Sequence, residues 1–293
     1  SSPEVTLTKA APFDKSYAKK YPDSIFLIDQ QNQGAGSTVN SGLKHATGKY
    51  FKMIDGDDWV EAEKLKSIIK KLEATDADLV LTDMLTYNEA EKRITDQSGY
   101  SIQPDTILNF SDVASELDIQ MHNTMYKTKL LKNHKIKLDN GFYTDIEYVL
   151  LPLPFVKTIT YFNLPFYIYR VARAGQSMSK ASMRKNAAQH QLVLTRLVDE
   201  YKAIQSQLQA ETEKYLVRAI GRMANTELRV RLLKESDLST KKADLRELFD
   251  WLKTYAGSDI YRAFLTGRKA FILKITHFRA TKLLVKAVEK KFY

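Results

Sequence analysis

The sequence predicts an α/β domain, with a mostly parallel sheet flanked by helices, followed by an all-helical C-terminal region. In the first half, short apolar runs alternate with stretches of helical periodicity. Strands separated by helices of this length favour right-handed crossovers and parallel pairing. Beyond residue 179 glycine is scarce, proline is absent, and apolar residues recur at helical intervals to the end. We therefore expect one domain over residues 1–180 and a helical region over residues 181–293.

Each element is predicted from the spacing of apolar residues. Leu65, Ile68 and Leu72, for example, share one face of an amphipathic helix. Residues 84–110 are mixed and polar, which indicates a hairpin or an excursion from the sheet. Strands are predicted over 24–29, 50–54, 78–81, 157–162 and 165–171, and helices over 36–46, 61–72, 111–117, 127–134, 144–151, 183–209, 211–234, 241–255 and 260–292.

Composition excludes several classes of protein. Apolar residues make up 44% and charged residues 27%, so a sizeable core is expected rather than wholesale disorder. The absence of cysteine excludes disulfides, thiolate metal sites and cysteine nucleophiles, and it suits a reducing cytoplasm. No run approaches the roughly 18 apolar residues of a spanning helix, and the first residues lack the order of a signal peptide. We expect a cytoplasmic protein, or one peripheral to the inner face of the plasma membrane.

The basic charge is concentrated at the C-terminal end. The net charge is +10, and residues 262–293 hold nine Lys or Arg against one acid, which gives 9 − 1 = +8. The same stretch repeats an apolar residue every seven positions. A basic amphipathic helix of this kind can lie on an anionic membrane surface, and packing onto the preceding helices explains the repeat equally well. No nucleic-acid-binding motif is present. The repeated residues are Phe264, Phe271, Phe278, Val285 and Phe292.

Three carboxylates are crowded into four residues, at Asp55, Asp57 and Asp58. They directly follow a predicted strand, and ligands of open α/β sheets bind at such strand ends. Like charges this close together are costly unless a cation neutralises them. Carboxylate oxygens suit Mg²⁺ or Mn²⁺, which share their coordination with substrate phosphates. Alternatively, the cluster is an acidic turn that caps the following helix.

The surrounding motifs resemble the family 2 glycosyltransferases of the GT-A fold. That pattern runs strand, N-x-G-x-x-x-x-x-N-x-G, helix, a-x-G-k-Y, strand, D-x-D-D, and it matches from residue 32 to residue 58. The resemblance implies a metal-dependent, inverting transfer of a sugar from a nucleotide sugar, with a UDP-sugar as the expected donor. It also implies metal and phosphate contacts at Asp55, Asp57 and Asp58. The implied nucleotide pocket comprises Asn32, Gly34, Asn40 and Gly42, with Asp55 beside the donor. Val39 stands where family members often carry an arginine.

The resemblance also implies a catalytic base on the acceptor side. Inverting transfer needs a carboxylate that takes the proton of the attacking hydroxyl. Asp145 occupies the matching place, Thr144 replaces the usual glutamate, and Glu147 is the second candidate base. A helix cap is the alternative role for Thr144 and Asp145.

Residues 165–179 resemble the loop that closes over the donor diphosphate in this family. Arg170 and Ser177 are therefore expected to touch the donor, although an edge strand and a solvated turn explain the same residues. The five histidines show no metal-ligand spacing, and His122 is interpreted as structural. The expected acceptor is a cell-surface glycan, a teichoic-acid-like polymer or a lipid-linked glycan.

The resemblance covers about residues 20–180, and the opening of the family pattern is not seen. Ser1 and its neighbours look like residues that follow the second family strand, so we expect the first N-terminal strands to be lacking. Two other functions stay open. One is a nucleotidyltransferase, which also pairs aspartates on a similar sheet. The other is a catalytically degenerate binding or scaffold subunit at the membrane.

Overall fold

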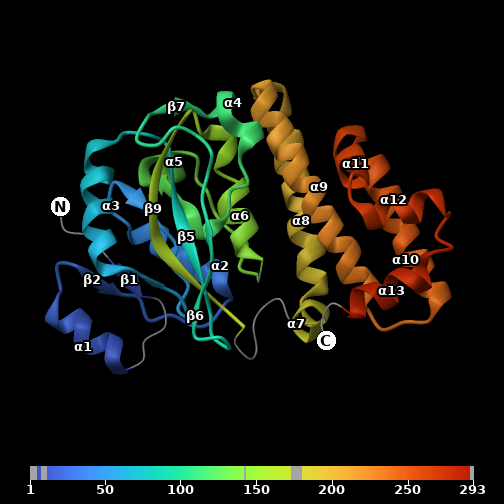
Figure 1. Ribbon diagram of the computed structural model, residues 1–293, viewed down its shortest axis with the longest axis horizontal. Coiled ribbons are helices and arrows are strands. Elements are labelled where there is room, and N and C mark those ends of the chain that lie inside the picture. The colour runs from blue at the N-terminus through green and yellow to red at the C-terminus, as the bar shows by residue number, and fades with distance from the viewer. Residues whose placement is uncertain (1–4, 8–11, 142, 173–179, 291–293) are drawn as a thin grey trace. The chain divides into compact units, whose positions relative to one another are not determined.

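The computed structural model describes residues 5–7, 12–141, 143–172 and 180–290. The chain divides into two compact units, residues 1–173 and residues 174–293 (Figure 1). The first combines strands and helices, and the described part of the second is helical. The sequence-based boundary near residue 180 lies close to this division.

The first unit alternates short strands with helices before its two long strands, β5 and β9. Each predicted element of residues 24–81 is present, with bounds that differ by a few residues. The elements are β1 (Val5–Leu7), α1 (Pro12–Lys20), β2 (Ile25–Leu27), α2 (Ala35–His45), β3 (Tyr50–Phe51), β4 (Trp59–Val60), α3 (Ala62–Ala74), β5 (Leu79–Asn88), β6 (Arg93–Ser98), β7 (Leu108–Asn109), α4 (Phe110–Val113), β8 (Thr124–Lys127), α5 (Thr128–Asn133), α6 (Thr144–Leu150) and β9 (Thr158–Val171).

The main sheet has the strand order β3-β8-β5-β9-β4, with β6 on β5 and β7 on β9. Among its described pairs only β5 and β9 are parallel, and the separate pair β1 and β2 is also parallel. The α/β class is confirmed, but the expectation of a mostly parallel sheet is wrong. The reason is that β6 returns from β5 as a hairpin, and the short strands β3, β4, β7 and β8 enter antiparallel from loops.

The strand β9 runs without a break through two predicted strands, 157–162 and 165–171. Its pairing with β5 shifts register beside Asp83, where Pro165 enters the strand. Proline lacks the N–H that a regular ladder needs, so it is tolerated at such an irregularity. This continuous strand carries Tyr167 and Arg170 toward the turn that holds the acidic cluster.

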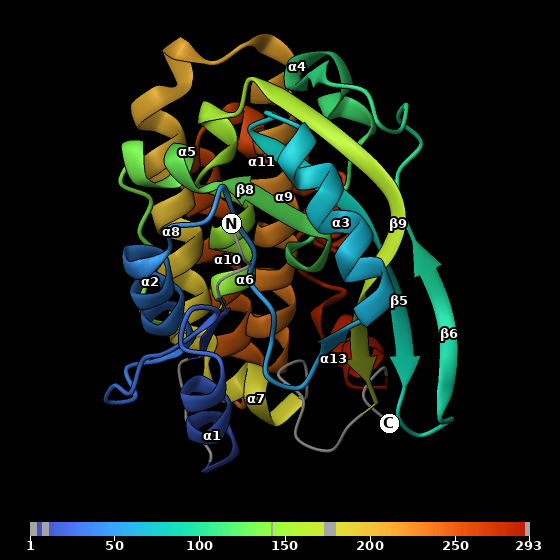
Figure 2. The same cartoon turned by 90° about the vertical axis from the view of Figure 1, so that its left-hand side faces the viewer.

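The helix α3 covers one face of the main sheet (Figure 2). Its Ile68 is 1% exposed and joins a core cluster from β5, β8 and β9 that includes Val80, Met125 and Tyr167. This packing buries a sheet face that includes Tyr167, a residue that contacts the acidic turn.

The second unit contains α7 to α13 in its described part. The predicted helix over residues 260–292 is wrong, because the chain breaks at Thr266–Gly267 and again at residues 276–280. At the second break His277 and Phe278 have φ values of 48° and 63°, which an α-helix does not accommodate. The helices are α7 (Lys180–Lys185), α8 (Ala187–Ile204), α9 (Ala210–Leu233), α10 (Leu238–Trp251), a π-helical turn (Leu252–Ala256), α11 (Ser258–Leu265), α12 (Arg268–Ile275) and α13 (Thr281–Glu289).

The seven-residue apolar repeat therefore does not form one stripe. Phe264 is fully buried, whereas Phe271 is 52% exposed. Phe292, the last member of the repeat, lies outside the described residues. Among the helices that the structure describes, none combines the length and apolar character needed to cross a bilayer.

Candidate active site

The acidic cluster forms a tight turn between β3 and β4. The backbone N–H of Asp58 donates to the carbonyl oxygen of Asp55 over 3.1 Å, which closes the turn. The chain then enters β4, where Val60 pairs with Tyr167 of β9. This pairing brings the acidic turn against β9.

The carboxylate of Asp58 is held by hydrogen bonds on both oxygens. The Tyr167 hydroxyl donates to Oδ2 over 2.5 Å, and the backbone N–H of Arg170 donates to Oδ1 over 2.8 Å. The same Tyr167 oxygen accepts from the backbone N–H of Asp55 over 3.2 Å. The Asp58 side chain is only 1% exposed. Tyr167 therefore links the two ends of the turn and fixes the orientation of one carboxylate.

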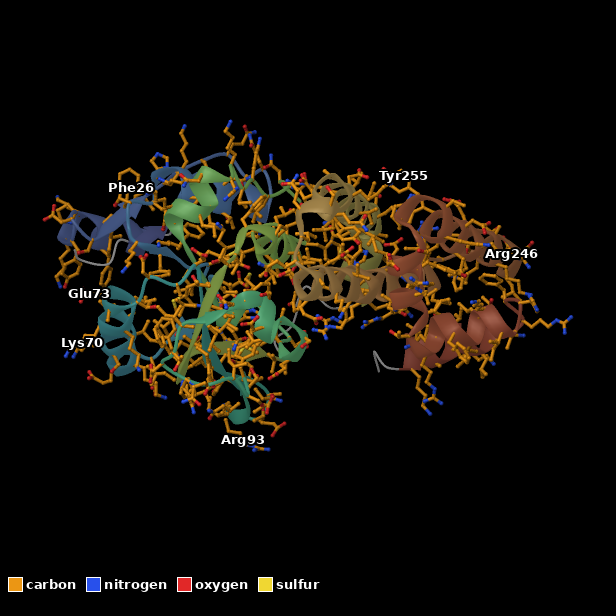
Figure 3. All side chains as sticks on the ribbon, turned by 90° about the horizontal axis from the view of Figure 1, so that it is seen from above. Phe26, Lys70, Glu73, Arg93, Arg246 and Tyr255 are labelled. Carbon is orange, nitrogen blue, oxygen red and sulfur yellow. The ribbon has the colours of Figure 1, made fainter. Side chains whose placement is uncertain are left out.

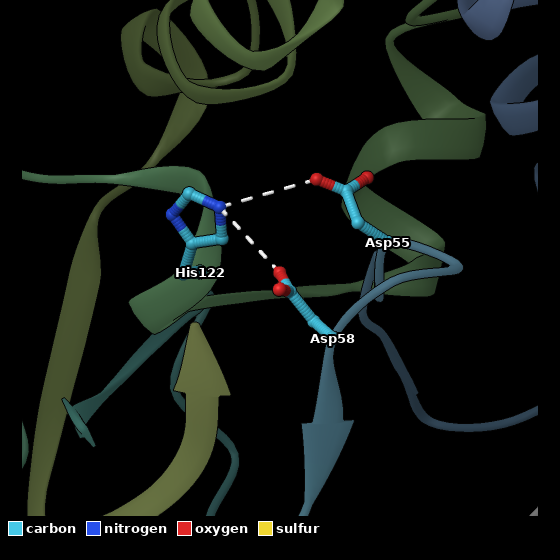
Figure 4. A group of neighbouring side chains, drawn as sticks. All are labelled: Asp55, Asp58 and His122. Carbon is cyan, nitrogen blue, oxygen red and sulfur yellow. Dashed lines mark ion pairs between the residues drawn. The ribbon is translucent and has the colours of Figure 1, made fainter. Parts of the chain in front are cut away.

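His122 lies against this pair of carboxylates (Figure 4). Its Nε2 is 4.0 Å from Oδ2 of Asp55 and 4.0 Å from Oδ2 of Asp58. The ring is carried by the short 3-10 helix Met121–Asn123 and packs on the ring of Tyr169, with 4.3 Å between the ring centroids. The interpretation of His122 as structural therefore misses a residue that faces the acidic turn.

The three side chains fit a shared divalent cation. One ligand atom from each of Asp55, Asp58 and His122 lies within 4.8 Å of the other two. Carboxylate oxygens suit both Mg²⁺ and Mn²⁺, whereas an imidazole nitrogen is a poor partner for Mg²⁺, which demands oxygen ligands. Of the two expected ions, this ligand set favours Mn²⁺.

The electrostatics of the cluster also favour a cation. Burial, together with the charges of Asp58, Asp57 and Asp145, raises the pKa of Asp55 to about 6. Burial, and then the charge of Lys52, lowers the pKa of His122 to about 4. The imidazole is thus neutral at pH 7, as a metal ligand must be, and repulsion among the carboxylates is relieved when a positive ion binds.

Lys52 holds the backbone of His122 by a hydrogen bond. Its ammonium donates to the carbonyl oxygen of His122 over 2.7 Å and lies 4.9 Å from the centre of the Tyr167 ring. Burial lowers the pKa of Lys52 to about 7. The lysine therefore fixes the backbone that carries the imidazole.

Asp57 stands beside the cluster rather than in it. Among the residues that the structure describes, the group able to share an ion comprises Asp55, Asp58 and His122, without Asp57. The charge of Asp57 nevertheless raises the pKa of Asp55 and of Asp58, after burial. Asp57 therefore contributes to the negative potential of the site.

The two candidate bases lie in different surroundings. Asp145 is exposed in the first turn of α6, and its charge acts on Asp55. Glu147 is fully buried, and its carboxylate accepts from the backbone N–H of Asp139 over 2.7 Å. An acceptor hydroxyl can reach an exposed carboxylate, so the geometry favours Asp145 over Glu147.

The start of α2 packs closely against the loop that follows α5. Gly34 has a φ of +97°, and a Cβ there would lie 1.7 Å from the carbonyl oxygen of Asn140. The side chain of Asn32 accepts from the Gly34 N–H over 3.1 Å. Asn32 is exposed, which leaves its side chain accessible to a ligand.

Two other predicted pocket residues are engaged in packing. The amide of Asn40 both donates to the carbonyl of Leu138 over 2.9 Å and accepts from its N–H over 2.8 Å. Gly42 faces the ring of Phe51. These contacts show that Asn40 and Gly42 pack α2 against its neighbouring elements.

The predicted donor loop is described only in part. The Arg170 guanidinium donates to Glu89 over 2.8 Å at the end of β5, and its backbone N–H holds Asp58. Ser177 lies outside the described residues. Sequence reasoning passed over Tyr167 and Lys52, although a lysine inside an apolar strand is itself a signal.

Comparisons with known proteins agree with the motifs. The model of glycosyl transferase family 2 matches residues 13–135. Glycosyltransferase GlyA of Streptococcus pneumoniae is 24% identical over 167 residues, which are 52% of this chain and 23% of GlyA. The minor teichoic acid biosynthesis protein GgaB of Bacillus subtilis is 27% identical over 183 residues, which are 61% of this chain and 20% of GgaB. The matched stretches thus span about a fifth of each relative's length.

A solved structure of TarS from S. aureus in complex with UDP-GlcNAc is similar over 92% of this chain and 83% of that chain, with 16% identity and a TM-score of 0.48. The family match begins at α1 and ends after α5, and so contains the acidic turn and His122. Residues 13–135, within the first unit, therefore carry a glycosyl transferase family 2 domain.

Proposed function

We propose that this chain transfers a sugar from a nucleotide sugar to a hydroxyl group, with inversion at the anomeric carbon. The observation that carries the proposal is the group formed by Asp55, Asp58 and His122, with the exposed Asp145 near enough to raise the pKa of Asp55. A cation-binding group and a separate accessible carboxylate are the two parts that such a transfer needs.

In this proposal the two parts act on opposite ends of the reaction. Asp55, Asp58 and His122 would hold Mn²⁺, or Mg²⁺ as the second choice, and the bound ion would neutralise charge on the departing diphosphate. Asp145 accepts the proton of the acceptor hydroxyl as that oxygen attacks the anomeric carbon. Tyr167 and the Arg170 N–H keep Asp58 in place, so that no reorganisation is needed when the donor binds.

The substrates follow from similarity alone. We propose a UDP-sugar as the donor, with Asn32 and Gly34 near the nucleotide, as the resemblance to the family pattern implies. The names of relatives support the acceptor class, since GgaB is a minor teichoic acid biosynthesis protein. We therefore propose a cell-surface glycan, a teichoic-acid-like polymer or a lipid-linked glycan as the acceptor.

The test measures nucleoside diphosphate released from a panel of nucleotide sugars, with Mn²⁺, with Mg²⁺ and with EDTA. We expect release from one donor, with more in Mn²⁺ than in Mg²⁺ and none in EDTA. Asp145→Asn should lower the rate by at least about a hundredfold, because general base catalysis contributes roughly 10²–10⁴. Asp58→Asn should also lower the rate, because it removes a ligand of the proposed ion. Glu147→Gln distinguishes the two candidate bases, because only the variant of the true base should lose the rate contributed by proton transfer.

Asp105→Asn is the matched control. Asp105 is exposed, pairs with Lys71 and has a φ of 56°, a conformation that asparagine also tolerates. Its variant should keep full activity. Binding of UDP and Mn²⁺ without release from any donor would instead support the degenerate scaffold subunit. Release that EDTA leaves unchanged would refute the assigned role of the cation.

A further inference from the structure

Residues 268–290 of the helical unit, here called the basic segment, expose many cations and no unpaired acid. The single acid, Glu289, lies 3.5 Å from the ammonium of Lys180 and 4.0 Å from the guanidinium of Arg184. Within the described part of the chain, the exposed cations of the segment form no ion pairs. These cations are Arg268, Lys274, Arg279, Lys282, Lys286 and Lys290.

A further cation lies beside the turn that joins α12 to α13. The guanidinium of Arg246, on α10, is 5.4 Å from the centre of the Phe278 ring. Arg246 is exposed and is labelled at the edge of the helical unit in Figure 3. The positive surface therefore extends beyond the basic segment itself.

Large apolar side chains stand among these cations. On α12, Phe271 and Ile275 are one helical turn apart and are 52% and 56% exposed. On α13, Leu283 is 68% exposed. The opposite faces of the two helices supply buried residues to the core, including Leu273 and Leu284. The exposed apolar residues therefore lie outside the buried core of this unit.

We propose that the basic segment docks on the surface of an anionic lipid bilayer. Cations that form no ion pairs match the phosphates of anionic headgroups, and apolar side chains beside them enter the acyl boundary. A nucleic acid would match the cations but would leave Phe271, Ile275 and Leu283 in water. Since α12 has 8 residues and α13 has 9, the segment lies in the interface rather than across the bilayer.

This proposal does not depend on the transfer reaction or on its substrates. It assigns a partner to the predicted basic stretch, even though that stretch is not one continuous helix. The surface belongs to two short helices and the turn between them, each with its own exposed face.

The test is co-sedimentation of the full chain with vesicles. One set is pure phosphatidylcholine, and the other contains about one third phosphatidylglycerol. We expect binding to the anionic set that weakens as salt rises, because the Debye length falls to about 8 Å at physiological ionic strength. Lys282→Gln combined with Lys286→Gln should lower partitioning by about tenfold or more. Phe271→Gln combined with Ile275→Gln should lower it at every salt concentration.

The matched control is Lys66→Gln combined with Lys70→Gln on the exposed side of α3. It lowers the net charge from +10 by the same two units and should leave binding nearly unchanged. Circular dichroism of each variant confirms that it is folded. Equal loss in the control pair would overturn the assignment to this segment, as would equal binding to neutral vesicles. A nucleic-acid partner would be indicated by two results together. Single-stranded DNA would abolish vesicle binding of the parent protein and of Phe271→Gln/Ile275→Gln alike, and that double variant would bind vesicles as well as the parent.

A second readout tests the depth of the apolar residues. Phe271→Trp adds an indole at the proposed contact, and its emission should shift to shorter wavelength on addition of anionic vesicles. The unsubstituted protein, with its two native tryptophans, gives the reference signal. An unchanged emission would show that Phe271 stays in water, and the proposal would fail.

Discussion

At the scale of single residues, the geometry of the acidic turn depends on a tyrosine that takes no part in the proposed chemistry. Tyr167 donates to Asp58 and accepts from the backbone of Asp55, so one hydroxyl fixes both ends of the acidic turn. Mutation of a residue that orients a metal ligand typically weakens metal binding. In the proposed cation site, Tyr167 would therefore act as a positioning residue.

We predict that Tyr167→Phe weakens Mn²⁺ binding by about tenfold, since loss of an orienting hydrogen bond typically costs 10–100-fold. Titration of free Mn²⁺ by electron paramagnetic resonance measures this without any activity assay. Tyr161→Phe is the control, because Tyr161 lies on the same strand and donates to Asp83 instead. Equal Mn²⁺ affinity in all three proteins would remove Tyr167 from this role.

The sequence could predict the carboxylates but not the histidine. Asp55, Asp57 and Asp58 fall within four residues, and this spacing, together with the neighbouring family motifs, indicates a cation site. His122 reaches the same point from a 3-10 helix between β7 and β8, and no local pattern marks it. Only the pairing of the short strands across the sheet brings it to Asp55, and that pairing is a long-range property.

At the scale of elements, the packing of α2 against the loop after α5 determines the position of α6, the helix that carries Asp145. Gly34 has no space for a side chain, because Asn140 lies directly against it. Asn40 bonds the backbone of Leu138 in the same loop. The glycines and asparagines of the family pattern therefore serve this close approach as well as any ligand.

We predict that Gly34→Ala lowers the free energy of unfolding by about 1–3 kcal/mol, from its left-handed backbone and the clash with Asn140. Thermal unfolding measures the loss. Gly56→Ala is the comparison, because a Cβ at Gly56 meets nothing within 4 Å. If both variants lost the same stability, the close approach at Gly34 would not be the cause.

Predicted elements failed where long-range geometry decided the outcome. The two strands over 157–162 and 165–171 merge into β9, since an irregularity in the pairing accommodates Pro165. The predicted helix over 260–292 breaks at Gly267, where a Cβ would lie 1.9 Å from the side chain of Asn225. Local periodicity carries no information about either neighbour.

The helices α8 and α9 are joined by a buried charged network. Glu227 is 1% exposed and bonds His190 over 2.7 Å and Arg231 over 2.8 Å. Arg231 in turn donates to Asp244 over 2.9 Å. Burial alone would raise the pKa of Glu227, but the hydrogen bonds from His190 and Arg231 outweigh it and hold that pKa below the ordinary 4.5.

We predict that the helical unit loses stability as pH falls below about 4.5. The unfolded carboxyl of Glu227 binds a proton there while the folded one resists it, so the contribution is full above that pH and lost below it. Glu227→Gln should flatten this dependence and cost about 3 kcal/mol near neutral pH, because a buried charge loses its partner. Thermal unfolding over a pH series measures both effects. Glu235→Gln, which alters an exposed ion pair, should cost less than about 1 kcal/mol and keep the slope.

At the scale of the whole molecule, each unit has its own core, and each carries a different surface. The first unit holds the acidic turn, and the second holds the buried Glu227 network and the basic segment. Stability gained from a ligand of one unit should therefore appear in that unit's unfolding.

We predict two unfolding transitions in calorimetry, and we expect Mn²⁺ with UDP to raise the midpoint temperature of only one of them. At about a hundred times the dissociation constant, a ligand stabilises its unit by about 2.7 kcal/mol. Asp58→Asn should abolish that shift, since it removes a ligand of the proposed ion. Glu227→Gln should lower the other transition and leave the shift intact. A single transition whose midpoint both variants lower would mean that the two units unfold together. The loss of stability from Glu227→Gln would then also affect the unit that holds the acidic turn.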